Sequence, residues 1–493
     1  MTSSILPCNA ITRRDVLGLL LILLVAAVLR LGRPDVLHFQ YDQAEIATLA
    51  QDVASGRAAH LLGQISSAGL PNSPMAHYIL VLPFALFKDP KAVTLTIALW
   101  NVVGVGLLWL LAHRYIDPRV ALVVGLLYAI SPAAIEYSRK IWVQNVHTPF
   151  ILLALLCSLY GFVEGKKWAQ AASFPLWLIG LQTHYATWTL LPLAVWPIWL
   201  GRRQIDWRAI IIGSVLGLLV VLPFGVGLVQ YISQDADAVG DSLSGAPLRL
   251  RGKVFYRVLP LLTGGLSIEI ERGVIDPGLL WESPLKLLVG LFLGGITLLG
   301  LVAVWVRQDW RVWAVPLLLW IVLPVLSFWP NLIGVQTHYF VPLVAGGCLA
   351  AGLGAVWLVE LTPQPARRIA WGFLSVGLVA MLLIQGVGHF AALEAKSTTD
   401  LAGMGIPLRM SLAVRDALAS YEDVLIVGGD STRSGHVVWE ALLYHTAESV
   451  REVVVADGGI AVLPAGPFAV LTAPLADPFP DGLYESGKAE VFP

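Results

Sequence analysis

The chain has 493 residues, of which 57% are hydrophobic and only 13% are charged. A soluble protein of this composition would have too few charged residues to cover its surface. The formal net charge of −1 indicates neither an acidic nor a basic partner, and we expect no nucleic-acid ligand. The composition therefore excludes an ordinary soluble protein, and the long apolar runs predict one that crosses a membrane many times.

We predict eleven membrane-spanning helices, the first of them uncleaved. Basic residues precede the first apolar run and recur in short connections between later runs. Positive residues beside helix ends mark the cytoplasmic side, so we expect the N-terminus inside and the C-terminus outside the plasma (inner) membrane. The basic connections are 164–167, 201–208, 307–311 and 363–368. The predicted spans are 15–31, 92–112, 119–134, 147–163, 168–182, 186–200, 209–230, 284–306, 312–329, 338–360 and 369–388.

The apolar segment 74–87 is treated differently, because it is short and contains Pro83. A helix needs about 20 residues to cross the hydrocarbon core. Counting this segment as a span would also move all the later basic connections to the outside. We therefore predict that it is a re-entrant or juxtamembrane helix within the first outer loop, 32–91.

The last hundred residues change in character. Short apolar runs at 421–430, 450–459 and 468–474 are typical of buried strands, and a helical pattern separates the first two. The predicted fold class is thus an α-helical polytopic membrane protein of about eleven transmembrane helices, comprising residues 1–390. A small α/β domain, residues 391–493, is expected outside the membrane.

Acidic residues follow the first span, in LHFQYDQAEIATLAQDVASG. One interpretation is a capping box, with Asp42 as N-cap of a helix over 43–55, Glu45 three residues later and Gly56 at its end. Such a helix has an apolar stripe and would lie on the outer membrane surface. The other interpretation is that Asp42 is a general base. Both can hold, because a cap fixes the position of a carboxylate.

Further candidate site residues fall on the same predicted outer side. Cationic and aromatic residues at the end of the third span could anchor the chain at lipid head groups or could bind a phosphate. The same Gln-Thr-His-Tyr sequence occurs twice, and a basic, aromatic segment lies in the long loop before residue 284. The candidate substrate-binding residues are His77, Tyr78, Arg139, Lys140, Trp142, Asn145, His184, Tyr185, Arg249, Arg251, His338 and Tyr339.

These motifs resemble a known superfamily. FQYDQAEIATLAQDVASGR is similar to the first outer loop of the C-type membrane glycosyltransferases, in the branch of protein O-mannosyltransferases, aminoarabinose-to-lipid A transferases and their bacterial relatives. SPAAIEYSRKIWVQN resembles the second outer loop of that branch, with a glutamine between its tryptophan-valine and asparagine. QTHYATW and QTHYFVP resemble its later His-Tyr positions.

The resemblance implies an inverting sugar transfer from a polyprenyl-phosphate donor to a protein, lipid or glycan acceptor at the outer face. Asp42 would deprotonate the acceptor, with Glu45 as the alternative carboxylate. Arg139 would hold the departing phosphate, and Lys140 and a residue of 249–257 are candidates to assist it. We expect no certain cofactor, although a divalent metal is possible in this superfamily. Two alternatives stay open, a lipid or sugar-lipid transporter and an inactive accessory subunit of a larger complex.

Overall fold

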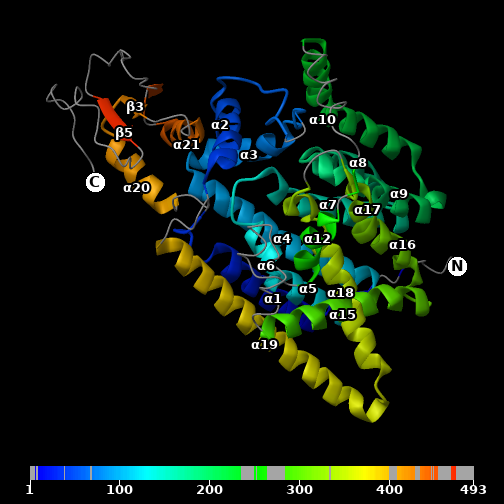
Figure 1. Ribbon diagram of the computed structural model, residues 1–493. Helices are drawn as coiled ribbons and strands as arrows, with labels where there is room; N and C mark the ends of the chain where they lie inside the picture. Colours follow the sequence, from blue (N-terminus) through cyan, green and yellow to red (C-terminus); the bar gives the residue numbers. More distant parts are fainter. Residues whose placement is uncertain are drawn as a thin grey trace. The chain divides into compact units, whose positions relative to one another are not determined.

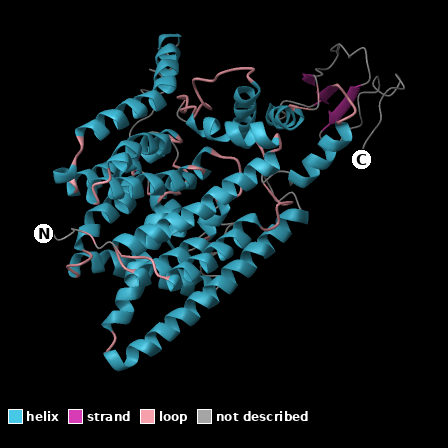
Figure 2. Cartoon of the chain, turned by 180° about the vertical axis from the view of Figure 1, so that it is seen from behind, coloured by secondary structure: helices cyan, strands magenta, loops and turns pink. Residues whose placement is uncertain are grey.

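The computed structural model describes most of the chain, in two compact units. The helical unit comprises Met1–Arg33, Leu61–Ala76 and Leu95–Ala395, and the α/β unit comprises Pro34–His60, His77–Thr94 and Lys396–Pro493. The described residues are mostly helical, with loops and a small sheet (Figure 2). They are 6, 9–37, 39–66, 69–234, 249–250, 252–263, 284–331, 335–398, 408–427, 433–445, 447, 449–453 and 468–472.

The helical unit is a bundle of long apolar helices joined by short turns (Figure 1). Its first half contains α1 (Arg13–Leu31), α4 (Pro90–Tyr115, which begins in the other unit), α5 (Pro118–Ile130), α6 (Pro132–Glu136), α7 (His147–Ser158), η2 (Leu159–Val163), α8 (Lys167–Gln182), η3 (Tyr185–Leu190), α9 (Leu191–Leu200) and α10 (Trp207–Gln234). Its second half contains α12 (Lys253–Thr263), α15 (Pro284–Val306), α16 (Ala314–Leu317), η6 (Leu318–Val322), α17 (Leu323–Phe328), η7 (Thr337–Phe340), α18 (Leu343–Leu361) and α19 (Gln364–Thr398).

Seven helical segments in the described residues are long and apolar enough to cross a membrane. They are Pro90–Tyr115, Val143–Val163, Trp207–Gln234, Leu288–Val306, Arg311–Phe328, Leu343–Leu361 and Gln364–Glu394. Helices also form at the other predicted spans, but α5 has 13 residues and α9 only 10. The protein is therefore a membrane protein built of many helices, and the count of eleven spans stays a prediction.

Close helix packing in the bundle depends on small residues. At the crossing of α15 and α18, a Cβ atom on Gly300 would lie 1.7 Å from the Ala350 carbonyl oxygen. A Cβ atom on Gly354 would lie 1.9 Å from the Ile296 carbonyl oxygen. Because only hydrogen fits at either position, the two backbones can touch, which is how helices commonly associate in lipid.

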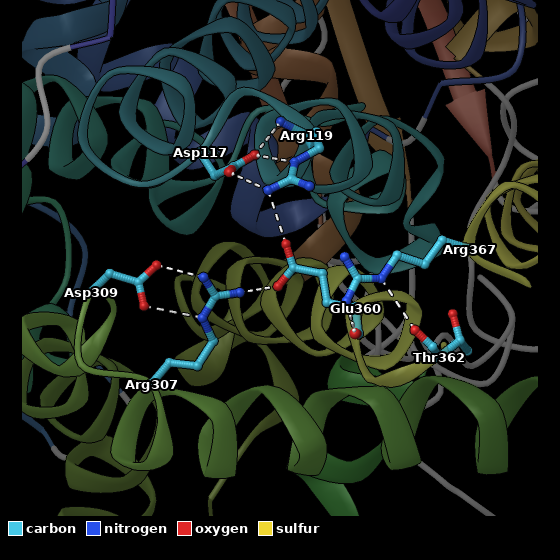
Figure 3. Close-up of polar contacts among 7 residues, drawn as sticks. All are labelled: Asp117, Arg119, Arg307, Asp309, Glu360, Thr362 and Arg367. Atoms are coloured by element: carbon cyan, nitrogen blue, oxygen red, sulfur yellow. Dashed lines mark hydrogen bonds and ion pairs between the residues drawn. The ribbon is translucent and has the colours of Figure 1, made fainter. Parts of the chain in front are cut away.

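One end of the bundle is tied together by ion pairs, and we call it the basic end. Arg114, at the end of α4, pairs with Glu164 after η2 at 2.6 Å. Arg119, at the start of α5, pairs with Glu360 at the end of α18 at 2.9 Å. Glu360 also pairs with Arg307 after α15 (Figure 3). Three of the helix ends that these pairs join, those after η2, α15 and α18, carry the basic connections 164–167, 307–311 and 363–368 of the sequence.

The α/β unit contains α2 (Tyr41–Ser55), most of α3 (Met75–Phe87), α20 (Leu408–Leu418), β3 (Asp423–Val427), α21 (Arg433–Leu443), β4 (Ser449–Val453) and β5 (Phe468–Thr472). The strands form a parallel sheet in the order β4-β3-β5, with Leu425 opposite Arg451 and Val470. Leu418, Val424, Leu443 and Ala469 form its core. A strand, helix, strand order of this kind favours parallel pairing because a helix can make the crossover connection.

One expectation about the acidic helix was wrong, the assignment of Asp42 as its N-cap. Helix α2 begins one residue before Asp42, and its N-cap is Gln40, whose N–H donates to the Gln43 side chain at 2.9 Å. Ile46 and Ala50 of its apolar stripe are buried within the protein, and α2 packs against α21 in the α/β unit. Gly56 does end the helix, with a φ of 75°.

Candidate functional site

The loop after α6 carries Lys140, Trp142 and Asn145, and hydrogen bonds hold its shape. The Asn145 side chain donates to the Lys140 carbonyl oxygen at 2.8 Å. The Asn101 side chain, from α4, donates to the Asn145 carbonyl oxygen at the same distance. Asn145 thus acts as a structural brace that fixes the backbone beside Lys140.

Lys140 is almost fully buried, with 6% of its surface exposed. Its ammonium nitrogen lies 4.3 Å from the centre of the Trp142 ring and 5.3 Å from that of Tyr137. Two aromatic faces stabilise a cation that has lost most of its water. The loop therefore presents a positive charge in a largely apolar setting.

The two Gln-Thr-His-Tyr copies meet beside this loop, although they are far apart in the sequence. The rings of His184 and His338 lie edge to face, with centres 6.2 Å apart. The ring centre of Tyr339 lies 5.2 Å from that of His184, with the two rings tilted. The ring centre of Trp142 lies 4.6 Å from that of His338. We call the set Lys140, Trp142, His184, His338 and Tyr339 the histidine cluster.

Both histidines of the cluster are electrically neutral near pH 7. Burial lowers the pKa of His184 to about 4. Burial, together with the charges of His184, Lys140 and Arg257, lowers the pKa of His338 well below its usual range. The Ala186 N–H donates to His184 Nδ1 at 3.1 Å. Because Nδ1 accepts this hydrogen bond, the proton of the neutral His184 ring is on Nε2. The cluster therefore combines a buried cation with a neutral N–H donor.

Arg257, on α12, is a second cation near the cluster, and the sequence analysis missed it. Its guanidinium lies 3.5 Å from the Thr337 hydroxyl, next to His338. The basic segment was singled out, but Arg249 and Arg251 were named instead. Arg249 pairs through its backbone with Asn331 in a two-residue ladder, and Arg251 lies outside the described residues. Lys253 and Arg257 are four residues apart, which places both on one face of a helix. This spacing could have singled out Arg257 in the sequence.

His147 is another residue that the sequence analysis missed. It opens α7, is 1% exposed, and lies close enough to His184 and His338 to affect them electrostatically. Both of its ring nitrogens are buried without a hydrogen-bond partner in the described residues. A buried polar atom of this kind usually finds a partner, so a ligand or water is expected beside it.

Arg139 makes a different set of contacts. Its Nη1 donates to the carbonyl oxygens of Arg30 at 2.6 Å and Gly32 at 2.7 Å. Its Nη2 donates to that of Arg33 at 2.9 Å. These carbonyls belong to the C-terminal end of α1, where helix carbonyls lack partners and a positive charge is favourable. Arg139 therefore stabilises the end of the first helix.

Tyr185 is positioned by the loop before α3. Its hydroxyl donates to the Pro71 carbonyl oxygen at 2.5 Å. Ser73 donates to the side chain of Gln182 at 3.1 Å. These bonds bring the segment 69–73 to the same end of the bundle as the histidine cluster. We call this end the histidine end.

In the α/β unit, Asp42 and Glu45 occupy the first turns of α2, and Asp42 is exposed. A carboxylate is favourable there because the helix N-terminus carries a partial positive charge. The charge of Glu45, then burial, then the charge of Asp42 raise the pKa of Tyr41. The two carboxylates thus create a local negative field around the Tyr41 ring.

A second acidic group in the α/β unit was not predicted. Asp52 accepts a hydrogen bond from the Tyr444 hydroxyl at 2.7 Å, and its other oxygen lies 2.9 Å from His60 Nε2. The Tyr444 hydroxyl is also 2.9 Å from that of Ser55, and Arg57 lies over its ring. Asp52, Ser55, His60 and Tyr444, which we call the Asp52 cluster, link α2 to the C-terminal segment.

His77 and Tyr78 lie beside the Asp52 cluster. The Tyr78 hydroxyl donates to the His60 carbonyl oxygen at 2.6 Å. The rings of His77 and Tyr78 are 4.9 Å apart, and His77 is 2% exposed. In the described residues, no three His, Cys, Asp or Glu side chains are arranged to hold a metal ion.

Comparison with known proteins identifies relatives of this architecture. Residues 71–226 match the model of the dolichyl-phosphate-mannose-protein mannosyltransferase family. None of the curated proteins matches the chain by sequence.

Several solved structures share the fold, among them the following two. ArnT from Cupriavidus metallidurans, bound to undecaprenyl phosphate, has a TM-score of 0.55 at 14% identity, over 89% of this chain and 86% of ArnT. The Archaeoglobus fulgidus oligosaccharyltransferase tethered with an acceptor peptide has a TM-score of 0.53 at 12% identity, over 89% of this chain and 63% of that enzyme. The resemblance to the C-type membrane glycosyltransferases is therefore confirmed.

Proposed function

We propose that this protein, which has the fold of a C-type membrane glycosyltransferase, transfers a sugar from a polyprenyl-phosphate donor to an acceptor at the outer face of the plasma membrane. The observation that carries the proposal is the histidine cluster. Lys140, Arg257 and two neutral imidazoles form a positive, partly desolvated setting at the end of an apolar bundle. A lipid phosphate suits this setting, because its chain stays in the bilayer while its charge meets cations.

In the proposed reaction, the acceptor attacks the anomeric carbon while the bond from that carbon to the donor phosphate breaks, with inversion. The departing polyprenyl phosphate gains negative charge. Lys140 and Arg257 stabilise that charge electrostatically, and Nε2–H of His184 donates a hydrogen bond to it. Arg139 stays a weaker candidate, because three of its hydrogen bonds hold the end of α1.

Asp42 is proposed as the general base that removes the proton from the attacking acceptor atom. It is exposed and belongs to a helix that α21 supports, so its carboxylate is accessible on a fixed element. Glu45 is one turn further along α2 and is the alternative base. Asp52 is less suited, because both of its oxygens already interact with Tyr444 and His60.

We further propose that the basic end faces the cytoplasm and the histidine end faces outward, with the α/β unit outside. The ion pairs of the basic end join the helix ends that the positive-inside rule assigns to the cytoplasm. Pro71 lies at the histidine end, whereas α4 finishes at the basic end. Residues 74–87 therefore begin and end on the outer side, which supports a helix that does not cross.

A donor-hydrolysis assay tests the proposal without knowledge of the acceptor, because water, deprotonated by the same base, can attack the anomeric carbon in place of the acceptor and release the free sugar. Purified protein in liposomes would be given a panel of polyprenyl-phosphate sugars, and release of polyprenyl phosphate would be followed by mass spectrometry. We expect release from at least one donor, and loss of release in the Asp42→Asn variant. The exposed basic-end variant Arg203→Gln is a matched control and should behave as wild type. A protein that binds these donors and releases nothing from any of them would contradict the proposal.

A further inference from the structure

Two short connections, 164–167 and 201–208, lie side by side at the basic end of the bundle. A Cβ atom on Gly201 would lie 1.9 Å from the Phe162 carbonyl oxygen, so only glycine allows the two backbones to come this close. Two further contacts join the segments, from the Gln204 side chain to the Val163 carbonyl oxygen at 3.0 Å and from Lys167 to Asp206 at 2.7 Å. We call the surface that the two connections form the cationic corner.

The cationic corner carries more positive charge than its carboxylates balance. Together with the neighbouring Arg114, the two connections contain six cations and two carboxylates. Glu164 pairs with Arg114, and Asp206 pairs with Lys167. The other four cations are exposed, and none of them forms an ion pair with a described residue: Lys166, Arg202, Arg203 and Arg208. Their positive charge is therefore available to an anion.

The ion pairs around Glu360 leave no such surplus. Figure 3 shows equal numbers of carboxylates and arginines there, namely Asp117, Asp309 and Glu360 with Arg119, Arg307 and Arg367. Arg367 donates to the Glu360 carbonyl oxygen at 2.9 Å. Unbalanced charge is thus a property of the cationic corner, and the network around Glu360 does not share it.

Three tryptophans accompany the cations and are largely exposed. The exposed fractions of Trp168, Trp199 and Trp207 are 65%, 60% and 71%. Trp168 directly follows the first connection, whereas Trp199 and Trp207 lie at the two ends of the second. The Arg202 guanidinium lies 5.2 Å from the centre of the Trp199 ring and donates to the Trp199 carbonyl oxygen at 3.0 Å. Tryptophans in this setting are typical of the head-group region of a bilayer, because the indole is apolar except for its N–H.

The helices that meet at the cationic corner present apolar rows to their surroundings. Each row has exposed residues at every fourth position: Leu191, Val195 and Trp199 on α9, and Trp207, Ile211 and Val215 on α10. Residues with this spacing lie on one face of a helix, so both rows lead to a tryptophan beside the cations. An occupant with an anionic head and hydrocarbon chains suits the cations and the rows together. An acidic protein segment would suit the cations alone.

We propose that the cationic corner binds an anionic phospholipid. The phosphate of the lipid interacts with Arg202 and Arg208, and its acyl chains lie along the apolar rows of α9 and α10. Clusters of lysine and arginine beside a membrane-spanning helix attract anionic lipids in this way. The histidine cluster is near the start of α7, whereas the cationic corner follows η2 at the other end of the same span. The site is therefore separate from the proposed donor site, and the proposal does not rest on the transfer reaction.

The test is native mass spectrometry of protein recovered from vesicles of equimolar phosphatidylcholine and phosphatidylglycerol. Wild type should retain phosphatidylglycerol in preference to phosphatidylcholine. Arg202→Gln and Arg208→Gln should each lower that preference about fivefold, which corresponds to about 1 kcal/mol. Arg368→Gln removes the same charge from an exposed arginine outside the cationic corner and should keep the preference. All three arginines are exposed, so none of these variants should unfold the protein.

Three results would overturn the proposal. Equal retention of both phospholipids by wild type would leave an acidic protein segment as the partner of the four cations. Equal losses in Arg208→Gln and Arg368→Gln would show that retention follows the overall charge and not the cationic corner. Displacement of phosphatidylglycerol by added polyprenyl phosphate would assign the corner to the donor lipid.

Discussion

The histidine cluster and the Asp52 cluster both contain histidine and tyrosine, but different physical effects shape them. In the histidine cluster, burial keeps the imidazoles neutral, and the aromatic rings contact one another directly. In the Asp52 cluster, a carboxylate accepts hydrogen bonds from Tyr444 and lies beside His60. Desolvation thus dominates in one region and hydrogen bonding to a charge in the other.

This difference suggests which region binds the donor phosphate and which removes the proton from the acceptor. A desolvated cation attracts a phosphate strongly, because charge interactions grow as water is removed. A general base instead needs to be reachable by the acceptor, as the exposed Asp42 is. Under the proposed function, donor binding thus belongs to the helical unit and proton removal to the α/β unit. The following variants should affect one function and leave the other intact.

The largest expected effect is that of Asp42→Asn on transfer. Loss of a general base typically lowers the rate by about 10²–10⁴-fold. The change should leave folding intact because Asp42 is exposed and is not the N-cap of α2. Initial rates of polyprenyl-phosphate release would be compared with those of Glu45→Gln. If Glu45→Gln is the inactive variant and Asp42→Asn works normally, Glu45 is the base.

Lys140→Gln should have the next largest effect, through donor binding. A hydrogen bond to a charged group is worth about 1.5–3 kcal/mol, so the KM for the donor should rise roughly 10–100-fold. Lys166→Gln is a matched control, because Lys166 also lies over a tyrosine ring but at the basic end. Equal changes in both variants would show that Lys140 acts through packing and does not bind phosphate.

His184 should make stability depend on pH between about 4 and 6.5. Its pKa is about 4 in the folded protein and near 6.5 when unfolded. The unfolded chain binds more protons in this window, so stability falls as the pH decreases through it, by at most about 3 kcal/mol from this residue. Melting temperatures from pH 4 to 7 should depend less on pH in His184→Gln. An unchanged pH dependence would mean that His184 is protonated normally.

The smallest expected effect is that of Tyr444→Phe. It removes the hydrogen bond to Asp52 and should destabilise the α/β unit by about 1–2 kcal/mol. Hydrogen exchange of α2 amides would report the loss, with Tyr231→Phe in the helical unit as the control. No change in exchange would show that the Asp52 cluster does not hold α2 to the C-terminal segment.

The sequence predicted the helices better than it predicted the side-chain contacts. Apolar runs and basic connections located the long helices of the bundle, because helix length and loop charge are local properties, but α12 formed in a segment that was expected to be an outer loop. The meeting of His184 with His338 was only suggested by their repeated motif. The N-cap was placed wrongly because an aspartate in a first turn and an aspartate at the cap look alike in sequence.

Other features could not have been found from the sequence. The partner of Asp52 is Tyr444, almost four hundred residues away, and no local pattern connects them. The role of Arg139 depends on three carbonyls at the end of α1, which are backbone atoms and leave no trace in residue type. Arg257 belongs to a segment with several other basic residues, and the sequence does not show which of them lies beside the histidine cluster.

The central claim is that the helical unit binds the donor phosphate and Asp42 performs the chemistry. The most direct test is the affinity of polyprenyl phosphate for Asp42→Asn and for Lys140→Gln, measured by native mass spectrometry in the same detergent. We predict wild-type affinity in Asp42→Asn despite its loss of transfer, and affinity reduced at least tenfold in Lys140→Gln. Wild-type affinity in Lys140→Gln, with reduced affinity in Asp42→Asn, would contradict this account.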